Sequence, residues 1–232
     1  MTTILSSPLP PIDESVPLTT LDLLLLTTFL PLWSIVYYRA VHSPTTGTPE
    51  GFDSSTFISN LHSVPLCLLA FLSLQQVISE SVPLWWSISF FIVDLVDTIA
   101  RRDVMFGVHA VISLMLNLLG GGSARHRALR SLSKGFFTEA STPFLNHWKK
   151  SKSYTSFLLL FLVFTSCRMI WVPYFLHNTY TIHLKGEYDF VFYPSVLFYI
   201  LQCLWYGKMC LMVVNYRMPK EVTDRLDKMK EQ

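Results

Sequence analysis

The sequence predicts an all-α fold, a multi-pass transmembrane helical bundle of six to seven helices. Only 15% of the 232 residues are charged and 51% are hydrophobic, whereas an ordinary soluble domain has about 25% charged residues. The mean hydropathy is positive, at +0.40. A helix needs about 20 apolar residues to cross a hydrocarbon core of about 30 Å. About six or seven such spans use almost the whole chain, so a separate soluble domain is excluded.

Apolar stretches of bilayer length define the predicted helices in order. They cover residues 18–38, 56–78, 82–100, 104–121, 154–176 and 190–214. A semi-polar stretch over 128–148 keeps an apolar face through Leu132, Phe136, Phe137 and Leu145. This stretch is a candidate for a seventh span whose polar side is covered by protein.

Two short tails flank the predicted transmembrane domain. Residues 1–17 contain four prolines and no basic residue, so we expect a disordered N-terminal tail. Residues 18–216 form the transmembrane domain, and residues 217–232 form a charged tail. With six or seven spans alike, Lys and Arg gather on the side of this C-terminal tail, and the positive-inside rule therefore places it in the cytoplasm.

The end of the cytoplasmic tail fits a receptor-read address. Lys228 and Lys230 match the lysine-x-lysine-x-x pattern of a dilysine retrieval signal. This pattern predicts a multi-pass protein of the endoplasmic-reticulum membrane with a cytoplasmic C-terminus. The alternative interpretation is a solvated, charged helix end.

The composition also argues against several kinds of partner and site. No run of basic residues interleaves with aromatic residues, so no nucleic-acid partner is expected. The four cysteines lie in apolar stretches without a CxxC spacing, which indicates neither a zinc site nor a disulfide framework. We expect no metal and no cofactor.

Ionisable residues inside the predicted spans are the first candidates for function, because each costs about 2.5 to 3.5 kcal/mol at mid-membrane on insertion scales. Asp94 and Asp97 are three residues apart and share a helix face, and Arg101 follows four residues after Asp97. Asp97 is therefore expected to pair with Arg101. Asp94 lies deeper and is the better candidate for a functional carboxylate.

The next span carries a polar stripe. His109, Ser113 and Asn117 are four residues apart and lie on one side of an otherwise apolar helix, which should face protein. His109 is a candidate general base or nucleophile, with Asp94 holding its tautomer. The alternative is a structural hydrogen bond between helices.

Further polar residues recur at helical spacing in the other predicted helices. They are Ser59 with His62, Glu139 with Asn146, Arg168, and Gln202 with Tyr206. A buried Arg168 needs an anion. An ion pair with Glu139 and a site for a lipid headgroup are equally compatible with the sequence.

The segment from Phe137 to Asn146 resembles the signature of the TLC-domain family, with a glutamate, then Ser-Thr-Pro, then an asparagine. Other matching residues follow in the expected order: Ser59, His62, Asp94, His109, Arg168, Gln202, Trp205 and Tyr206. The resemblance covers about residues 20–216. It is closest to the small TLC-domain-containing proteins and more distant from ceramide synthases and translocating-chain-associated proteins.

The resemblance implies a ring of spanning helices around a central lipid cavity, in which the Glu139 segment is a span, and therefore seven spans. Ceramide synthases join a fatty acyl-CoA to a sphingoid base and use two adjacent histidines, where this chain has His109 and Ala110. They carry two aspartates where this chain has Glu139 and Thr142. Both departures weaken the resemblance to the synthases.

Two functions follow as the main hypotheses. The first is a membrane protein that binds lipid and contributes to membrane lipid homeostasis, with His62, Glu139, Asn146, Arg168, Gln202 and Tyr206 as cavity or structural polar residues. The alternative is a ceramide-synthase-like, acyl-CoA-dependent N-acyltransferase whose catalytic residues are His109 and Asp94. Membrane lipids are the expected partners, with fatty acyl-CoA or a sphingoid base in the second case. A cargo-receptor or translocation role is a third hypothesis, and the oligomeric state stays open.

Overall fold

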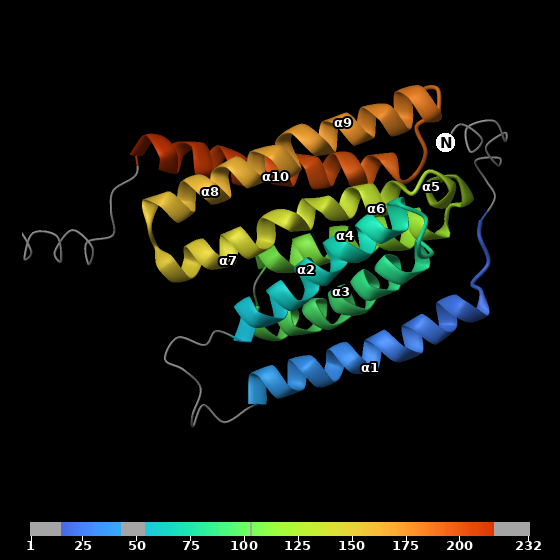
Figure 1. The fold of residues 1–232 in the computed structure, drawn as a ribbon, viewed down its shortest axis with the longest axis horizontal. Coiled ribbons are helices and arrows are strands. Elements are labelled where there is room, and N and C mark those ends of the chain that lie inside the picture. The colour runs from blue at the N-terminus through green and yellow to red at the C-terminus, as the bar shows by residue number, and fades with distance from the viewer. Residues whose placement is uncertain (1–14, 43–53, 103, 216–232) are drawn as a thin grey trace, which may run out of the picture.

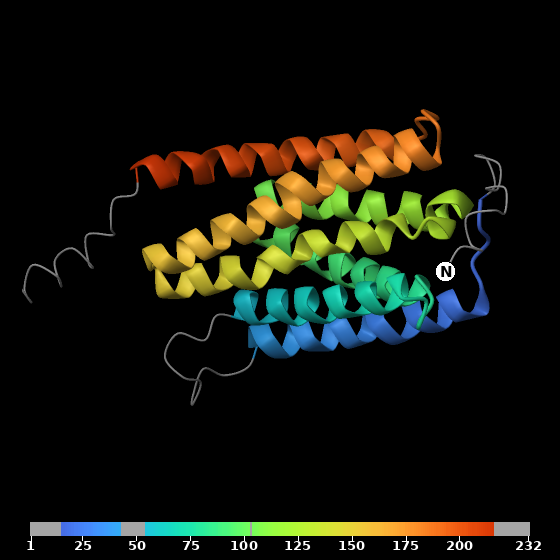
Figure 2. The ribbon, with the colours of Figure 1, turned by 45° about the horizontal axis from the view of Figure 1, so that its top comes forward.

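The structure is a computed structural model that describes residues 15–42, 54–102 and 104–215. Every regular element in these residues is a helix, which confirms the predicted all-α bundle. The long helices lie side by side along a common direction (Figures 1 and 2). In chain order the elements are α1 (Thr20–His42), α2 (Ser54–Leu74), α3 (Ser81–Arg101), α4 (Val104–Gly122), α5 (Ala124–Ala128), α6 (Ser131–Phe136), the 3₁₀ helix η1 (Phe137–Ser141), α7 (Thr142–Ser151), α8 (Tyr154–Phe164), the π-helix η2 (Thr165–Ile170), α9 (Trp171–His177), the π-helix η3 (Asn178–His183) and α10 (Phe192–Asn215).

The described elements combine into seven rods. α6, η1 and α7 follow one another without a break, and so do α8, η2, α9 and η3. The helices α1, α2, α3, α4 and α10 are single rods, while α5 is one short turn. Because the number of rods is odd, α1 begins and α10 ends at opposite ends of the bundle (Figure 1).

Five described stretches are long and apolar enough to cross a membrane: Thr20–Ala40, Thr56–Leu74, Ser81–Ala100, Tyr154–His183 and Phe192–Val213. The apolar part of α4, Phe106–Gly122, is shorter. The rod made of α6, η1 and α7 is not one of the five, although it packs along α2 within the bundle (Figure 2). Its crossing of the membrane stays a prediction.

Three predicted helix ends are wrong. The first helix ends at His42 instead of residue 38. The second helix ends at Leu74 instead of residue 78, because Gln76 takes a left-handed conformation, with φ of 61°, just after it. The fifth helix continues past residue 176 to His183. Its last turns form the π-helix η3, and Gly186 reverses the chain with φ of 84° before α10.

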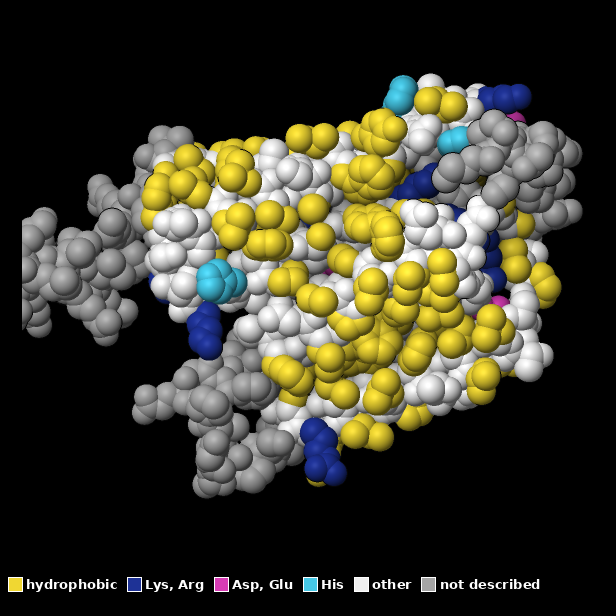
Figure 3. Space-filling view, viewed as in Figure 1, with side chains coloured by type: hydrophobic (Ala, Val, Ile, Leu, Met, Phe, Trp, Pro, Cys, Tyr) yellow, Lys and Arg dark blue, Asp and Glu magenta, His cyan; other side chains and the backbone are white. Residues whose placement is uncertain are grey.

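Apolar side chains cover the outside of the bundle. Leu24, Leu68, Leu162 and Leu204, on four different helices, are between 59% and 61% exposed. Figure 3 shows apolar side chains over the middle of one face, while Lys and Arg side chains lie toward its ends. Large exposed apolar surface is unfavourable in water and is accommodated by lipid. The protein is therefore a multi-pass membrane protein.

A buried carboxylate ties the first helix to the rest of the bundle. Asp22 is fully buried and accepts a hydrogen bond from Nε1 of Trp85 on α3 at 2.8 Å. Nη2 of Arg127 on α5 donates to the same carboxylate at 3.3 Å. These contacts hold α1, α3 and α5 together at one end of the bundle.

The predicted tails fall largely outside the described residues. Residues 1–14, residues 217–232 and the two lysines of the predicted retrieval signal, Lys228 and Lys230, are among those not described. Directly before α1, the N–H of Val16 donates to the carbonyl oxygen of Gly122 at 2.9 Å. The last residues of the predicted N-terminal tail thus lie along the turn between α4 and α5.

Candidate functional site

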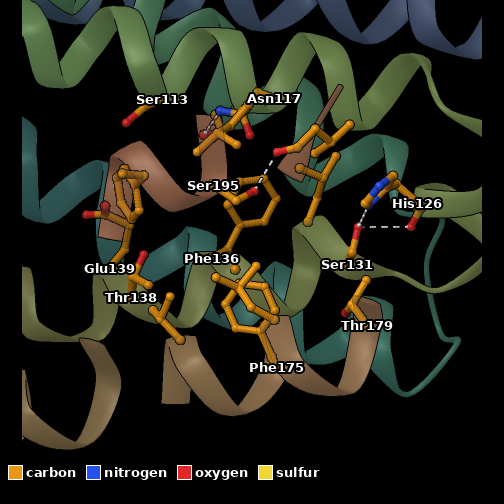
Figure 4. Close-up of a pocket in the computed structure, with 18 of the residues that line it drawn as sticks. Ser113, Asn117, His126, Ser131, Phe136, Thr138, Glu139, Phe175, Thr179 and Ser195 are labelled. Carbon is orange, nitrogen blue, oxygen red and sulfur yellow. Dashed lines mark hydrogen bonds between the residues drawn. The ribbon is translucent and has the colours of Figure 1, made fainter. Parts of the chain in front are cut away.

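A cavity of about 90 Å³ lies inside the bundle, between α4, α6, η1, α9, η3 and α10. Its wall is mainly apolar, with Leu66, Leu116, Leu132, Phe136, Val172, Phe175, Leu176, Val191 and Phe198. Figure 4 shows Glu139 and Thr138 at one end, and His126, Ser131 and Thr179 at the other. We call these the glutamate end and the histidine end of the cavity.

The glutamate end depends on a proline that shortens a helical turn. Pro143 has no N–H, so the carbonyl oxygen of Glu139 loses the donor that an α-helix would supply. The chain tightens into η1, in which the N–H of Thr142 donates to this oxygen. The hydroxyl of Thr142 also donates to Oε2 of Glu139 at 2.8 Å. The buried carboxylate is thereby held at the cavity wall.

Arg168 reaches the glutamate end from a distorted part of its helix. Pro173 lacks the N–H that would bond to the carbonyl oxygen of Met169, and the turn before it widens into the π-helix η2. Nε of Arg168 donates to the carbonyl oxygen of Thr138 at 3.1 Å and to Oγ of Ser141 at 2.8 Å. The irregular backbone of η1 therefore supplies acceptors for a buried guanidinium.

Side chains from two other elements complete the surroundings of Arg168. Nη1 donates to Oε1 of Gln202 on α10 at 2.5 Å, and Nη2 lies 4.0 Å from Oε1 of Glu139. The guanidinium lies over the ring of Phe164, on which Tyr206 stacks. The structure thus brings four residues selected from the sequence into one connected group.

His62 and His109 lie near this group but not on the cavity wall. The ring of Phe91 contacts both, with centroid distances of 5.4 Å to His62 and 6.0 Å to His109. Both imidazoles interact electrostatically with the carboxylate of Glu139. Among the described residues, Nε2 of His62 and Nδ1 of His109 are buried without a hydrogen-bond partner.

Asp94 lies toward α1. Its carboxylate accepts a hydrogen bond from the hydroxyl of Tyr37 at 2.8 Å. The described residues contain no hydrogen bond between Asp94 and His109, so the contact expected to hold the histidine tautomer is not formed. The side chain of Arg101, the expected partner of Asp97, lies outside the described part of the chain.

Two asparagines link neighbouring helices. Nδ2 of Asn146 on α7 donates to Oδ1 of Asn60 on α2 at 2.7 Å. Nδ2 of Asn117 on α4 donates to Oγ of Ser87 on α3 at 3.1 Å. The predicted polar stripe of α4 faces protein at Ser113 and Asn117, both of which are buried and line the cavity.

The histidine end joins two connecting segments that are far apart in the sequence. Nε2 of His126 lies 2.8 Å from Oδ2 of Asp189, and Nδ1 lies 2.8 Å from Oγ of Ser131. Oδ1 of Asp189 accepts hydrogen bonds from the N–H of Val191 at 3.0 Å and the hydroxyl of Tyr180 at 3.3 Å. All of these side chains are buried.

The contacts of Asp189 keep its carboxylate ionised. Burial raises the pKa of this carboxyl, but hydrogen bonds from His126 and the backbone of Val191 outweigh burial and hold the pKa below its ordinary value of 3.8. An ionised carboxylate only accepts hydrogen bonds, so Nε2 of His126 carries a hydrogen. In a neutral ring Nδ1 then keeps its lone pair toward Ser131.

This second polar group was not predicted from the sequence. His126, Ser131 and Asp189 lie in or beside connections, where polar residues are ordinary and give no signal in a hydropathy pattern. Their positions bordering apolar stretches are visible in the sequence, but the contact between His126 and Asp189 spans 63 residues.

Within the described residues the four cysteines are free. No group of three or more His, Cys, Asp or Glu residues in the described part of the chain is placed to hold a metal ion. The polar groups described at and beside the cavity are carboxylates, imidazoles, hydroxyls, amides and one guanidinium.

Comparisons with known proteins identify one family. A family model described as TLC domain matches residues 56–211. This range includes both ends of the cavity. No curated protein and no solved structure matches the sequence.

Proposed function

The chain belongs to the TLC-domain family, and from this premise we propose that it binds a membrane lipid in the cavity and contributes to membrane lipid homeostasis. The observation that carries the proposal is an apolar cavity inside the bundle that ends on the buried carboxylate of Glu139. Arg168 lies 4.0 Å from this carboxylate and donates to Gln202, so the group continues beyond the cavity wall. A lipid has the matching combination of an apolar chain and a polar group.

The size of the cavity limits what it takes up. An engineered apolar cavity of about 150 Å³ holds one benzene molecule, so about 90 Å³ accommodates part of an acyl chain. Each buried methylene contributes about 0.8 kcal/mol relative to water, and much less relative to lipid. Selectivity must therefore come from the polar groups at the two ends.

The geometry favours lipid binding over acyl transfer by His109. A nucleophilic imidazole must present a free nitrogen to the acyl group. Nδ1 of His109 is buried, and the residue does not line the cavity. Its ring packs against Phe198 and Trp205, with centroid distances of 5.7 Å and 5.4 Å.

Filling the cavity tests the proposal. Gly135 lines the cavity, and a Cβ added there would lie 3.8 Å from the ring of Phe175, in ordinary contact. Gly135→Leu should place a side chain in the cavity and reduce the lipid that copurifies with the full chain, measured by native mass spectrometry in mild detergent. Gly207→Leu is the matched control, because Gly207 lies on the exposed side of α10 with open space around it.

Equal lipid content in Gly135→Leu, Gly207→Leu and the unaltered protein would contradict binding in this cavity. Incubation with labelled acyl-CoA and a long-chain amine tests the alternative in the same preparations. An acyl adduct that disappears in His109→Ala would establish the acyltransferase instead.

We also propose that the protein resides in the endoplasmic-reticulum membrane, with Lys228 and Lys230 acting as a cytoplasmic retrieval signal. Replacing both lysines with serine should allow the protein to reach later compartments, observed by fluorescence microscopy of tagged protein. An unchanged location would contradict the signal. Replacing Lys220 and Arg225 with serine controls for the loss of charge from the same tail.

A further inference from the structure

The histidine end of the cavity has the arrangement of a nucleophile, a base and an orienting carboxylate. Oγ of Ser131 lies 2.8 Å from one ring nitrogen of His126, and Asp189 lies 2.8 Å from the other. These are the contacts that activate a serine in acyl transfer, where geometry and role define the group and sequence order does not. Here Nδ1 faces the serine and Nε2 faces the carboxylate.

The backbone presents Ser131 at a fixed turn. The preceding residue, Arg130, has φ of 50°, which residues other than glycine rarely adopt. Its guanidinium donates to the carbonyl oxygen and the hydroxyl of Ser73, which fastens the turn to α2. Ser131 and His126 both line the cavity, so a bound molecule can reach the reactive pair.

A third cavity residue points to a polar group on the bound molecule. Thr179 is 1% exposed and lines the cavity, and its Oγ1 has no hydrogen-bond partner among the described residues. A buried hydroxyl without a partner is unfavourable, and a ligand oxygen would satisfy it. Figure 4 shows Thr179 at the same end of the cavity as His126 and Ser131.

From these contacts we propose that Ser131, His126 and Asp189 cleave carboxylic esters of lipids, with the acyl chain along the apolar wall of the cavity. The inference rests on the proposed function for the binding of that chain. Ser131 and His126 are the catalytic residues, and Asp189 is a positioning residue. The hydroxyl of Thr179 is available to donate to the oxygen of the ester carbonyl.

The reaction needs only the ester and water. Oγ of Ser131 attacks the carbonyl carbon while its proton passes to Nδ1 of His126. The bond from the carbonyl carbon to the alcohol oxygen then breaks, and the alcohol leaves with the proton from Nδ1. Water attacks the acyl-serine in the same way, which releases the fatty acid and restores the serine.

The hydroxyl of Ser131 has a second acceptor, the carbonyl oxygen of His126 at 3.2 Å. A purely structural group would use these hydrogen bonds only to fasten α5 and α6 to the segment before α10. Reactivity of the serine separates the two roles.

The test uses the full chain in detergent micelles and an octyl fluorophosphonate, which forms a stable adduct with activated serines. We expect one adduct per chain, located by peptide mapping on Ser131, and none in Ser131→Ala. His126→Gln should slow labelling at least about 100-fold, since general-base catalysis contributes about 10² to 10⁴. Release of p-nitrophenol from p-nitrophenyl octanoate should be lost in Ser131→Ala and should slow in His126→Gln by the same factor as labelling.

The matched control is Ser166→Ala. Ser166 is exposed and lies away from the cavity wall, its hydroxyl donates to the carbonyl oxygen of Leu162 at 2.9 Å, and it should not be labelled. Its replacement should therefore leave the labelling rate unchanged. Asp189→Asn should lower the maximal labelling rate at least about tenfold and leave the half-saturating probe concentration unchanged. A general loss of structure would change both quantities.

The absence of an adduct on Ser131 in the unaltered protein would overturn the proposal, and this result does not depend on the folding of any variant. Labelling of His126→Gln at the unaltered rate would also overturn it. Copurified lipid is measured in the same samples. A protein that retains lipid without labelling leaves the proposed function intact, whereas unchanged lipid content in Gly135→Leu removes that function independently.

Discussion

The two ends of the cavity solve the problem of burying polar groups differently. At the glutamate end, Arg168 and Glu139 are opposite charges on two rods, and backbone oxygen from η1 completes the hydrogen bonding. At the histidine end, His126 and Asp189 come from connections between rods, and they are joined by one direct hydrogen bond of 2.8 Å. The first end is built by distorting helices and the second by folding connections over the bundle.

The polar side chains at the two ends of the cavity are held in place by different features. Pro143 and Pro173 remove backbone donors; the irregular turn beside Pro143 presents acceptors to the guanidinium, and the turn before Pro173 carries Arg168. The histidine end instead depends on Asp189, whose second oxygen is held by the backbone of Val191. We therefore expect charge changes to cost most at the glutamate end.

The largest expected effect is for Arg168→Leu. This change leaves the buried carboxylate of Glu139 without its cationic neighbour, and breaking one partner of a buried pair costs about 3 to 5 kcal/mol of unfolding free energy. Adding Glu139→Gln should recover much of the loss. Both are measured by denaturation of the full chain in detergent micelles.

Lys208→Leu is the matched control for Arg168→Leu. Lys208 is an exposed basic residue in α10, and its replacement should change the unfolding free energy by no more than about 0.5 kcal/mol. Simple additivity of Arg168→Leu and Glu139→Gln would show that the 4.0 Å contact has no coupling energy. Arg168 would then be available for a lipid headgroup.

The sequence was sufficient to predict most of the glutamate end and almost nothing of the histidine end. Arg168, Glu139 and Gln202 are conspicuous because polar residues are expensive inside apolar helices. The pairing of His126 with Asp189 depends on how two connections meet in space, and no local pattern encodes it. Asp94 illustrates the same limit, because its rotation toward Tyr37 follows from the packing of α1 against α3.

Most of the seven rods could also be predicted from the sequence. Hydropathy identified α1, α2, α3, α4, α10 and most of the rod from α8 to η3, because their apolar residues continue for about the length of a bilayer. The rod of α6, η1 and α7 was recognisable only by its apolar face and by the resemblance to the TLC signature. The distortions within it follow from Pro143, whose missing N–H is visible in the sequence, although the place where Arg168 docks is not.

The next largest effect is expected at Glu80, a buried glutamate whose surroundings differ from those of Glu139. Glu139 has Arg168 beside it, whereas Glu80 accepts a hydrogen bond from the N–H of Ser133 and leaves Oε2 without a hydrogen-bond partner among the described residues. Glu80 lies in the connection between α2 and α3. Burial raises the pKa of this carboxyl from 4.5 to about 7, against the opposing effects of the hydrogen bonds from Ser133 and the charge of Arg130.

This shift makes the protein less stable as the pH rises. Between about pH 4.5 and 7 the folded state holds a proton that the unfolded state has released, so the unfolding free energy falls across this window by up to about 3 kcal/mol. Glu80→Gln should remove that slope and stabilise the protein at pH 8, measured by denaturation at several pH values. Glu187→Gln should keep the slope, since Glu187 is exposed. Persistence of the slope in Glu80→Gln would contradict the assignment to Glu80.

The smallest effect distinguishes hydrogen bonds that only join helices from those at the cavity. The amide of Asn146 donates to Asn60 on α2, away from the cavity wall, whereas the amide of Asn117 donates to Ser87 and lines the cavity. Hydrogen bonds between membrane helices contribute on the order of 1 kcal/mol, so Asn146→Leu and Asn117→Leu should each lower the unfolding free energy by about that amount.

The effects of Asn146→Leu and Asn117→Leu on copurified lipid should differ. Asn146→Leu should leave the lipid content unchanged, because its partner lies on a helix surface that the lipid does not touch, and Asn117→Leu should change it. If both variants lose lipid equally, retention follows the stability of the whole bundle, and the polar groups of the cavity wall do not select the ligand.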